Sequence, residues 1–233
     1  MSASRSDLLA AVYYPETDGK PMAETDRHRQ SMVDLIESLK NFFAGEDEVY
    51  VSGNLLLYYI PGNTRKSLAP DVFVVRGVPK QQRRTYKLWE ERVPIVVIEV
   101  SSRETKKEDL GRKKELYEQF GVPEYFIFDP EYKLKPAFRA FRLKAGQYVE
   151  VAIAGGRIPS AELGLELVDT GRTLRLFNPR TGEILFTPEE EAEARLGALL
   201  RAEHAEERAE HAEERAELLA AKLRELGVDP NRI

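Results

Sequence analysis

Residues 94–100 have the sequence Pro-Ile-Val-Val-Ile-Glu-Val, an apolar run that holds one carboxylate. Apolar residues on both faces of so short a run are typical of a central strand in a sheet that is covered on both sides. Residues 124–129, Glu-Tyr-Phe-Ile-Phe-Asp, follow the same pattern. Between the two runs, residues 105–120 have the period of a helix, which ends at Gly121. The sequence therefore predicts a strand, a helix and a second strand over residues 94–129.

The segments on either side of this unit extend the same fold. Residues 24–44 have the apolar period of a helix, and residues 71–76 predict a short strand after Pro70. Residues 48–60 predict one long or bent strand around Gly53, and residues 136–186 alternate and turn like antiparallel hairpins. We expect an α/β (α+β) fold for residues 1–186, with a mixed central sheet flanked by helices.

Residues 187–233 predict a second domain of another kind. The heptapeptide Arg-Ala-Glu-His-Ala-Glu-Glu occurs at 201–207 and again at 208–214. Apolar residues recur there in steps of three and four: Ala202, Ala205, Ala209, Ala212, Ala216, Leu219, Leu223 and Leu226. This heptad pattern predicts a helical coiled-coil tail, and a single solvated helix held by neighbouring charges is the alternative. His204 and His211 lie two turns apart, so we expect them to be exposed and not to be metal ligands.

The composition excludes several classes of protein. The 233 residues include no cysteine, which rules out disulfides, thiolate zinc sites and a cysteine nucleophile. No apolar run approaches the ~18 residues of a membrane span, and no apolar secretory core follows the N-terminus. We therefore expect a cytoplasmic protein without a membrane segment. The net charge is −5, of which residues 187–233 carry −6 and residues 1–186 carry +1. Because residues 1–186 are nearly neutral, only a local cluster of basic residues could indicate a polyanionic partner.

Two acidic residues stand where apolar or turn residues would be expected. Glu99 shares a strand face with Ile95 and Val97, and a carboxylate there is costly unless it is paired, coordinated or at an edge. If residues 71–76 and 94–100 pair as antiparallel neighbours, Asp71 lies beside Glu99. Two adjacent carboxylates repel each other, and in active sites a divalent cation relieves the repulsion. The alternatives are a strand-end Glu99 in solvent and a turn residue at Asp71.

A lysine lies on the apolar side of the helix predicted over 105–120. On a helical wheel, Lys113 falls in the apolar arc between Tyr117 and Phe120. Lys106 lies on the same arc and is a rival for the same role, and a lysine that snorkels to solvent is the structural alternative. Two carboxylates and one amine suit phosphodiester hydrolysis assisted by Mg²⁺ or Mn²⁺, with the lysine orienting water or steadying the transition state.

Four blocks of sequence carry a resemblance to a known family. They are Pro70-Asp71-Val-Phe-Val-Val, Val96-Val-Ile-Glu99-Val-Ser-Ser, Asp109-Leu-Gly-Arg-Lys113-Lys-Glu-Leu-Tyr117 and Gly121-Val-Pro-Glu-Tyr-Phe-Ile-Phe-Asp129-Pro. Over roughly residues 14–186 the chain resembles the Uma2 family of restriction endonuclease-like proteins, in the PD-(D/E)XK nuclease superfamily. The resemblance implies a core of one helix, three strands, a helix and a strand.

The resemblance also implies an activity and its residues. It implies a Mg²⁺-dependent DNA endonuclease in which Asp71 and Glu99 bind the metal and Lys113 is catalytic. The usual superfamily lysine stands two residues after the acid, where this chain has Ser101. Families like this one move the lysine onto the following helix, where Lys113 matches. Glu24 is a candidate further ligand from the first helix, with a helix-start charge as the alternative.

The substrate and the partners are less defined by the sequence. DNA is the expected substrate, and residues 77–93 form a basic loop with aromatic rings that could meet it or could be an ordinary solvated loop; its residues are Lys80, Arg83, Arg84, Tyr86, Lys87 and Trp89. A homodimer, formed through the tail or through the core, would supply two active sites for two strands. One alternative function is a degenerate nuclease fold that binds nucleic acid without cleaving it. Another is an interaction module that acts through the tail.

Overall fold

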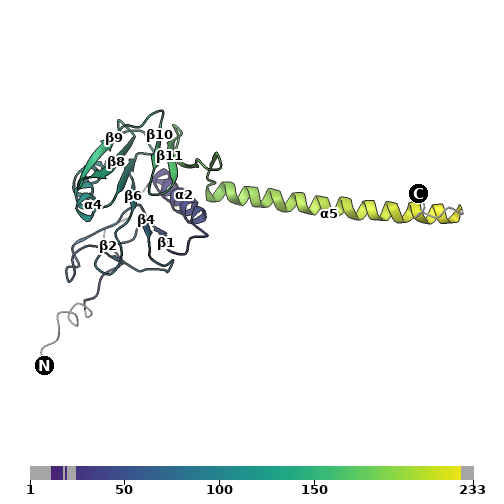
Figure 1. Ribbon diagram of the computed structural model, residues 1–233, viewed down its shortest axis with the longest axis horizontal. Helices are drawn as coiled ribbons and strands as arrows, with labels where there is room; N and C mark the ends of the chain where they lie inside the picture. Colours follow the sequence, from purple (N-terminus) through teal and green to yellow (C-terminus); the bar gives the residue numbers. More distant parts are fainter. Residues whose placement is uncertain (1–11, 18, 20–24, 227–233) are drawn as a thin grey trace, which may run out of the picture. The chain divides into compact units, whose positions relative to one another are not determined.

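A computed structural model describes residues 12–17, 19 and 25–226, and the chain divides into two compact units, Met1–Thr187 and Pro188–Ile233. The first unit is built on a six-stranded sheet (Figure 1). In spatial order its strands are β1 (Val49–Ser52), β4 (Val72–Arg76), β6 (Val96–Val100), β7 (Glu124–Phe128), β8 (Phe138–Lys144) and β9 (Gln147–Val151). β6 and β7 pair in parallel and the other neighbours pair antiparallel, which confirms the mixed sheet and the central position predicted for residues 96–100.

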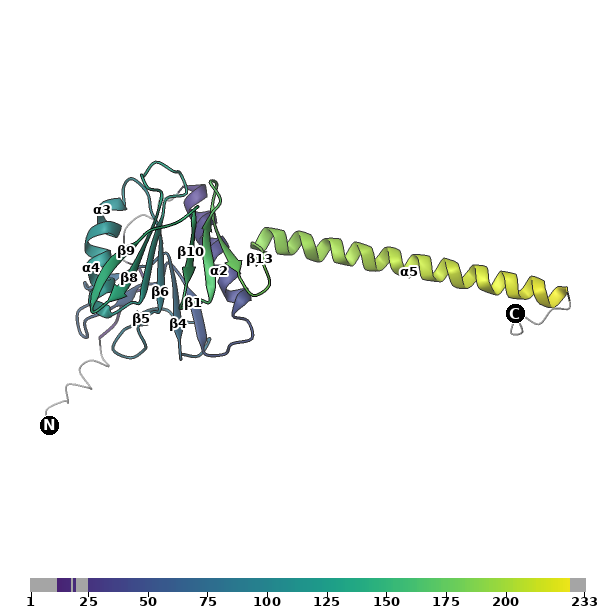
Figure 2. The same cartoon turned by 45° about the horizontal axis from the view of Figure 1, so that its top comes forward.

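Helices cover both faces of this sheet. On one face α2 (Asp26–Phe42) packs Leu35 and Leu39 against Ile98 of β6. On the other face lies the helical segment after β6, which consists of α3 (Lys106–Glu108), the π-helical turn η1 (Asp109–Lys113) and α4 (Lys114–Phe120). Tyr117 of α4 packs there with Val97. Figure 2 shows α2 and α4 on opposite sides of the strands. For the strands of the main sheet, the helix, three-strand, helix, strand order is therefore confirmed.

The single strand predicted over residues 48–60 is wrong. β1 ends at Ser52, and β2 (Leu57–Tyr58) belongs to a small separate sheet with β3 (Ser67–Leu68) and β5 (Tyr86–Lys87). Asn54 breaks the run, because its φ of 50° lies in the left-handed region that ends extended structure. Its backbone N–H donates to the carbonyl of Pro70 at 2.8 Å, which ties the bend to the segment that carries Asp71.

The hairpins predicted after residue 136 are present in two groups. β8 and β9 extend the main sheet, and the rest form an antiparallel four-stranded sheet of β10 (Arg157–Ser160), β11 (Leu165–Asp169), β12 (Leu174–Asn178) and β13 (Glu183–Ile184). Leu167 and Leu176 of this second sheet belong to the same core as Leu35 of α2. The second sheet therefore helps α2 to cover one face of the main sheet.

The second unit is the helix α5 (Pro188–Glu225), which has 38 residues. None of its residues is buried. His204 and His211 are exposed, as expected, with side chains 72% and 79% accessible. Among the described residues, no helix combines the length and the apolar character that a membrane crossing requires.

Candidate active site

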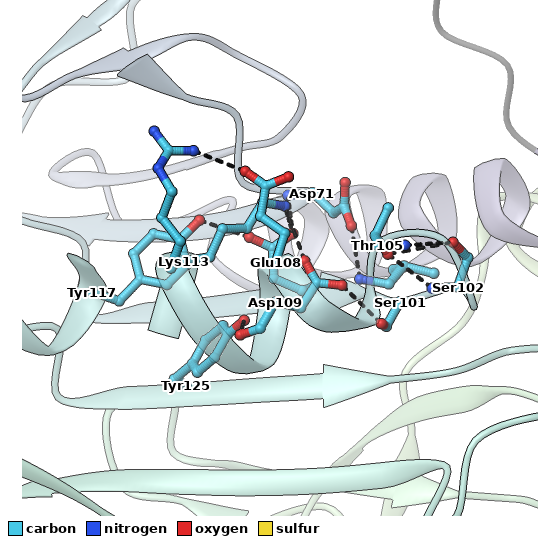
Figure 3. A network of polar contacts seen from close by, with 12 residues as sticks. Asp71, Ser101, Ser102, Thr105, Glu108, Asp109, Lys113, Tyr117 and Tyr125 are labelled. Carbon is cyan, nitrogen blue, oxygen red and sulfur yellow. Dashed lines mark hydrogen bonds and ion pairs between the residues drawn. The ribbon is translucent and has the colours of Figure 1, made fainter. Parts of the chain in front are cut away.

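The pairing of β4 with β6 brings two distant carboxylates to the same end of the sheet. Val72 lies opposite Ile98 in the antiparallel register, so Asp71, one residue earlier, meets Glu99, one residue later. The backbone N–H of Asp71 donates to Glu99 Oε2 at 3.4 Å, and the N–H of Val100 donates to Asp71 Oδ2 at 2.8 Å (Figure 3). The two side chains that the sequence singled out are therefore neighbours.

Glu99 is completely buried, so its interpretation as a strand-end residue in solvent is wrong. Its Oε1 accepts a hydrogen bond from the Tyr117 hydroxyl at 2.7 Å. Its Oε2 accepts one from the Lys113 ammonium at 2.8 Å. Strand alternation predicted the face on which Glu99 lies, but it did not predict that the side chain would be enclosed from both sides.

Lys113 points inward and does not snorkel to solvent. Its side chain is 13% exposed, and its Nζ lies 2.8 Å from Glu99 Oε2 and 3.2 Å from Asp109 Oδ1. Lys106, the rival position, takes part in no ion pair among the described residues. The geometry therefore brings Lys113, and not Lys106, to the carboxylates.

Asp109 is a site residue that the sequence analysis missed. It is 1% exposed, and its Oδ2 accepts a hydrogen bond from the Ser101 hydroxyl at 2.7 Å. The signal was available, since the wheel that places Lys113 on the apolar arc puts Asp109 at about 260°, between Leu116 and Phe120. Ser101 thus helps to hold an acid that also contacts Lys113.

His28 of α2 was also missed. Its Nε2 lies 3.6 Å from Asp71 Oδ2, and its ring is buried. It lies on the apolar stripe of α2 with Met32 and Leu35, four and seven residues later, so a periodicity reading could have found it. Glu24, the candidate further ligand, lies outside the described residues.

The two carboxyl groups have opposite pKa shifts. Burial raises the pKa of Glu99 well above its ordinary value, and the charges of Asp71 and Asp109 add to this, although Lys113 opposes it. Burial also acts to raise the pKa of Asp71, but the contact with His28 and the charge of Lys113 outweigh it, so that the pKa of Asp71 lies below its ordinary value. The surroundings therefore favour the charged form of Asp71 more strongly than they favour the charged form of Glu99.

A cleft of about 370 Å³ opens onto this cluster. Asp71, Lys113 and His28 line it, together with Ser102 and Lys133 from the loops that follow β6 and β7. Glu99 lies beneath the lining. Substrate in the cleft would therefore meet Asp71 and Lys113 directly.

The donor set fits a hard divalent cation held in part by substrate and water. Among the described residues, no set of three or more His, Cys, Asp or Glu side chains is arranged to hold a metal. Mg²⁺ commonly takes only one or two carboxylates and completes its shell with water and phosphate oxygens, which two acids can satisfy. Oε1 of Glu99 accepts from Tyr117 and Oε2 accepts from Lys113, and each carboxylate oxygen has a second lone pair that a cation could use.

Part of the basic loop before β6 is packed into the protein. Tyr86 is fully buried, and the Arg83 side chain is 4% exposed with its guanidinium 4.1 Å from the centre of the Tyr50 ring. Partners within the chain engage its basic groups: Phe43 and Ala44 carbonyls for Lys80, Glu91 for Arg83, Glu16 for Arg84 and Glu90 for Lys87. The loop is therefore packed only in part: Arg83 and Tyr86 lie inside the protein, whereas Lys80 and Arg84 stay on the surface, the Arg84 side chain 84% exposed.

Comparisons with known proteins point to one family. The family model Uma2, described as "Putative restriction endonuclease", matches residues 13–175, well over half of the chain. The chain is similar to the crystal structure of "a putative nuclease belonging to DUF820" from Anabaena variabilis ATCC 29413, with 12% identity, a TM-score of 0.46, and coverage of 68% of this chain and 89% of that one. No curated protein matches.

Proposed function

This chain belongs to the Uma2 family, whose description is that of restriction endonucleases, and from that membership we propose that it is a metal-dependent nuclease that hydrolyses DNA phosphodiester bonds. The observation that carries the proposal is the convergence of Asp71, Glu99 and Lys113 at one sheet end beneath an open cleft. Asp71 directly precedes β4, Glu99 belongs to β6 and Lys113 belongs to η1.

The surroundings of Asp71, Glu99 and Lys113 suit each of them to a different role in the proposed hydrolysis. Asp71 stays ionised at the cleft wall, where the Val100 N–H and His28 hold one of its oxygens. Bound Mg²⁺ or Mn²⁺ would be held by Asp71 and Glu99 and would supply an acidified water and a counter-charge for the phosphate. Lys113 keeps its proton at neutral pH, because Glu99 and Asp109 offset the effect of burial and raise its pKa. Its ammonium can then donate hydrogen bonds to negative charge that develops on the phosphate.

One observation favours a second candidate function. The carboxylate of Glu99 is closed off by Tyr117 and Lys113, an arrangement that is complete without a cation. A fold that binds nucleic acid in the cleft without cleaving it would keep the same contacts. Metal-dependent cleavage decides between the two functions.

The test is cleavage of supercoiled plasmid by the full chain with Mg²⁺, Mn²⁺ or Ca²⁺, for the natural sequence and for Asp71→Asn and Glu99→Gln. We expect each substitution to lower cleavage at least about 100-fold while thermal unfolding stays cooperative. Glu115→Gln is the matched control, because Glu115 is an exposed acid on the neighbouring helix and its loss should change nothing. If the natural chain binds DNA but cleaves it with none of these metals, the binding function holds and hydrolysis is rejected.

A further inference from the structure

α5 carries a fixed order of charge around its apolar seam. The structure shows this segment as one unbroken helix (Figure 1), so the heptad positions can be assigned directly. With the alanine and leucine seam at positions a and d, position g is Arg201, Arg208 and Arg215, and position e is Glu206 and Glu213. One edge of the seam is therefore basic, and the other edge is acidic.

A single helix does not neutralise these charges. The residues three and four places from Arg208 are His204, Ala205, His211 and Ala212, none of which is acidic. Arg201 and Arg215 likewise have no acid at those distances. The glutamates have like neighbours, since Glu206 precedes Glu210 by four residues. Neighbouring like charges destabilise an isolated helix, so this pattern disfavours the solvated single helix held by local ion pairs.

We propose that α5 binds α5 of a second copy of this chain, in parallel and in register. In such a pair each g residue faces the e residue five places later in the other helix. Arg201 then meets Glu206 of the partner subunit, and Arg208 meets Glu213 of the partner subunit. Both edges of the seam repeat these contacts, so Arg201, Arg208, Glu206 and Glu213 each gain an opposite neighbour, whereas Arg215 faces Ala220 of the partner subunit.

The same charges oppose an antiparallel pair. In that orientation g faces g and e faces e, so arginine would meet arginine and glutamate would meet glutamate. The seam can form in either orientation, because alanines let the helices approach closely and Leu219 and Leu226, 62% and 78% exposed, provide apolar surface at its end. Charge therefore selects the orientation. The pairing goes beyond the proposed hydrolysis and does not depend on it.

A pair of matched double variants tests the charge contacts in the full chain. Glu206→Lys with Glu213→Lys reverses position e, and Glu207→Lys with Glu214→Lys reverses the outward position f. Both change the net charge equally, and both place the new lysines beside the same glutamates of their own helix, Glu203, Glu210 and Glu217. By sedimentation equilibrium we expect the e variant to weaken dimerisation at least about ten-fold relative to the f variant. Equal dissociation constants, or a monomeric natural chain at tens of micromolar, would overturn the proposal.

Cysteine crosslinking tests the orientation. The chain has no cysteine, so Ala202→Cys and Ala216→Cys each introduce a single thiol on the seam, fourteen residues apart. In a parallel, in-register pair each thiol faces its own copy, within the short Cα separation that a disulfide needs. We expect both variants to form disulfide-linked dimers under mild oxidation, and the outward Glu207→Cys not to do so. An antiparallel pair would link at most one of the two seam variants, and that result would reject the parallel arrangement.

Discussion

Lys113 and Glu99 form a buried ion pair, with 2.8 Å between Nζ and Oε2, although one residue belongs to the helical segment and the other to the central strand. Such a pair is held by its geometry, since removing one partner leaves a charge in a place that water does not reach. The same ammonium also contacts Asp109 at 3.2 Å. Lys113 is therefore expected to contribute both to the stability of the fold and to the proposed hydrolysis.

Lys113→Met is expected to abolish cleavage and to lower the free energy of unfolding by about 3 kcal/mol, because Glu99 and Asp109 lose their counter-charge. Lys106→Met is the matched control, and it should leave both quantities within about 0.5 kcal/mol and a factor of two. Urea unfolding and plasmid cleavage measure the two effects. Loss of cleavage in the Lys106 variant alone would transfer the catalytic role to the other lysine.

Asp109→Asn is expected to act through Lys113. Asp109 contacts the ammonium with one oxygen and Ser101 with the other, and it is too buried to touch substrate. We predict a ten- to hundred-fold lower maximal rate with little change in the Mg²⁺ concentration for half-maximal cleavage, since the proposed ligands remain. A large shift in the Mg²⁺ requirement would instead make Asp109 a metal ligand. Glu108→Gln, at the exposed neighbouring acid, should leave the rate unchanged.

Much of the core could be predicted from the sequence because it rests on local patterns. The apolar runs at 94–100 and 124–129, with a helix between them, already imply the parallel pair β6 and β7. The meeting of Asp71 with Glu99 followed from one assumption about strand direction. The single strand predicted over residues 48–60 was wrong, because the apolar residues continue through a bend. That bend depends on the backbone conformation of Asn54 and on its contact with Pro70, which is distant in sequence.

The sequence predicted part of this cluster of charged side chains, again from local patterns. Glu99 and Lys113 stood out because a charge interrupted an apolar face. Asp109 and His28 did the same but were overlooked, and the π-helical turn that carries Asp109 has no simple sequence signature. The burial of Arg83 and Tyr86 in the basic loop depends on the distant residue Tyr50, which contacts both, so composition alone could not reveal it.

Gly53→Ala is expected to disturb the site through the backbone. A Cβ at Gly53 would lie 2.0 Å from the carbonyl oxygen of Asp71 and 2.6 Å from Ile36 Cδ1, closer than atoms can approach. Since backbone must move, we predict a loss of about 1–3 kcal/mol in the free energy of unfolding and lower cleavage. Gly45→Ala, where the new methyl group meets nothing within 4 Å, should leave both unchanged. Similar behaviour of the two variants in urea unfolding and cleavage would contradict this close packing.

Glu99→Gln is expected to become more stabilising, relative to the natural chain, as the pH rises. Burial raises the pKa of Glu99 well above its ordinary value of about 4.5, so the folded protein releases this proton at a higher pH than the unfolded chain does. The stability that this protonated group contributes is complete below about pH 4.5 and is lost as the pH rises through the raised pKa, because the unfolded state then binds fewer protons. Glutamine does not titrate and avoids this loss.

The prediction is measured as the difference in the free energy of unfolding between Glu99→Gln and the natural chain, by urea titration at about pH 5, 6.5 and 8. The difference should increase with pH in favour of the glutamine variant, whereas Glu115→Gln, at an exposed position, should show no change with pH. A difference that falls with pH would mean that Lys113 stabilises the charged form of Glu99 by more than burial disfavours it. The ionised Glu99 side chain would then increase the free energy of unfolding, and keeping it in the site would not cost stability.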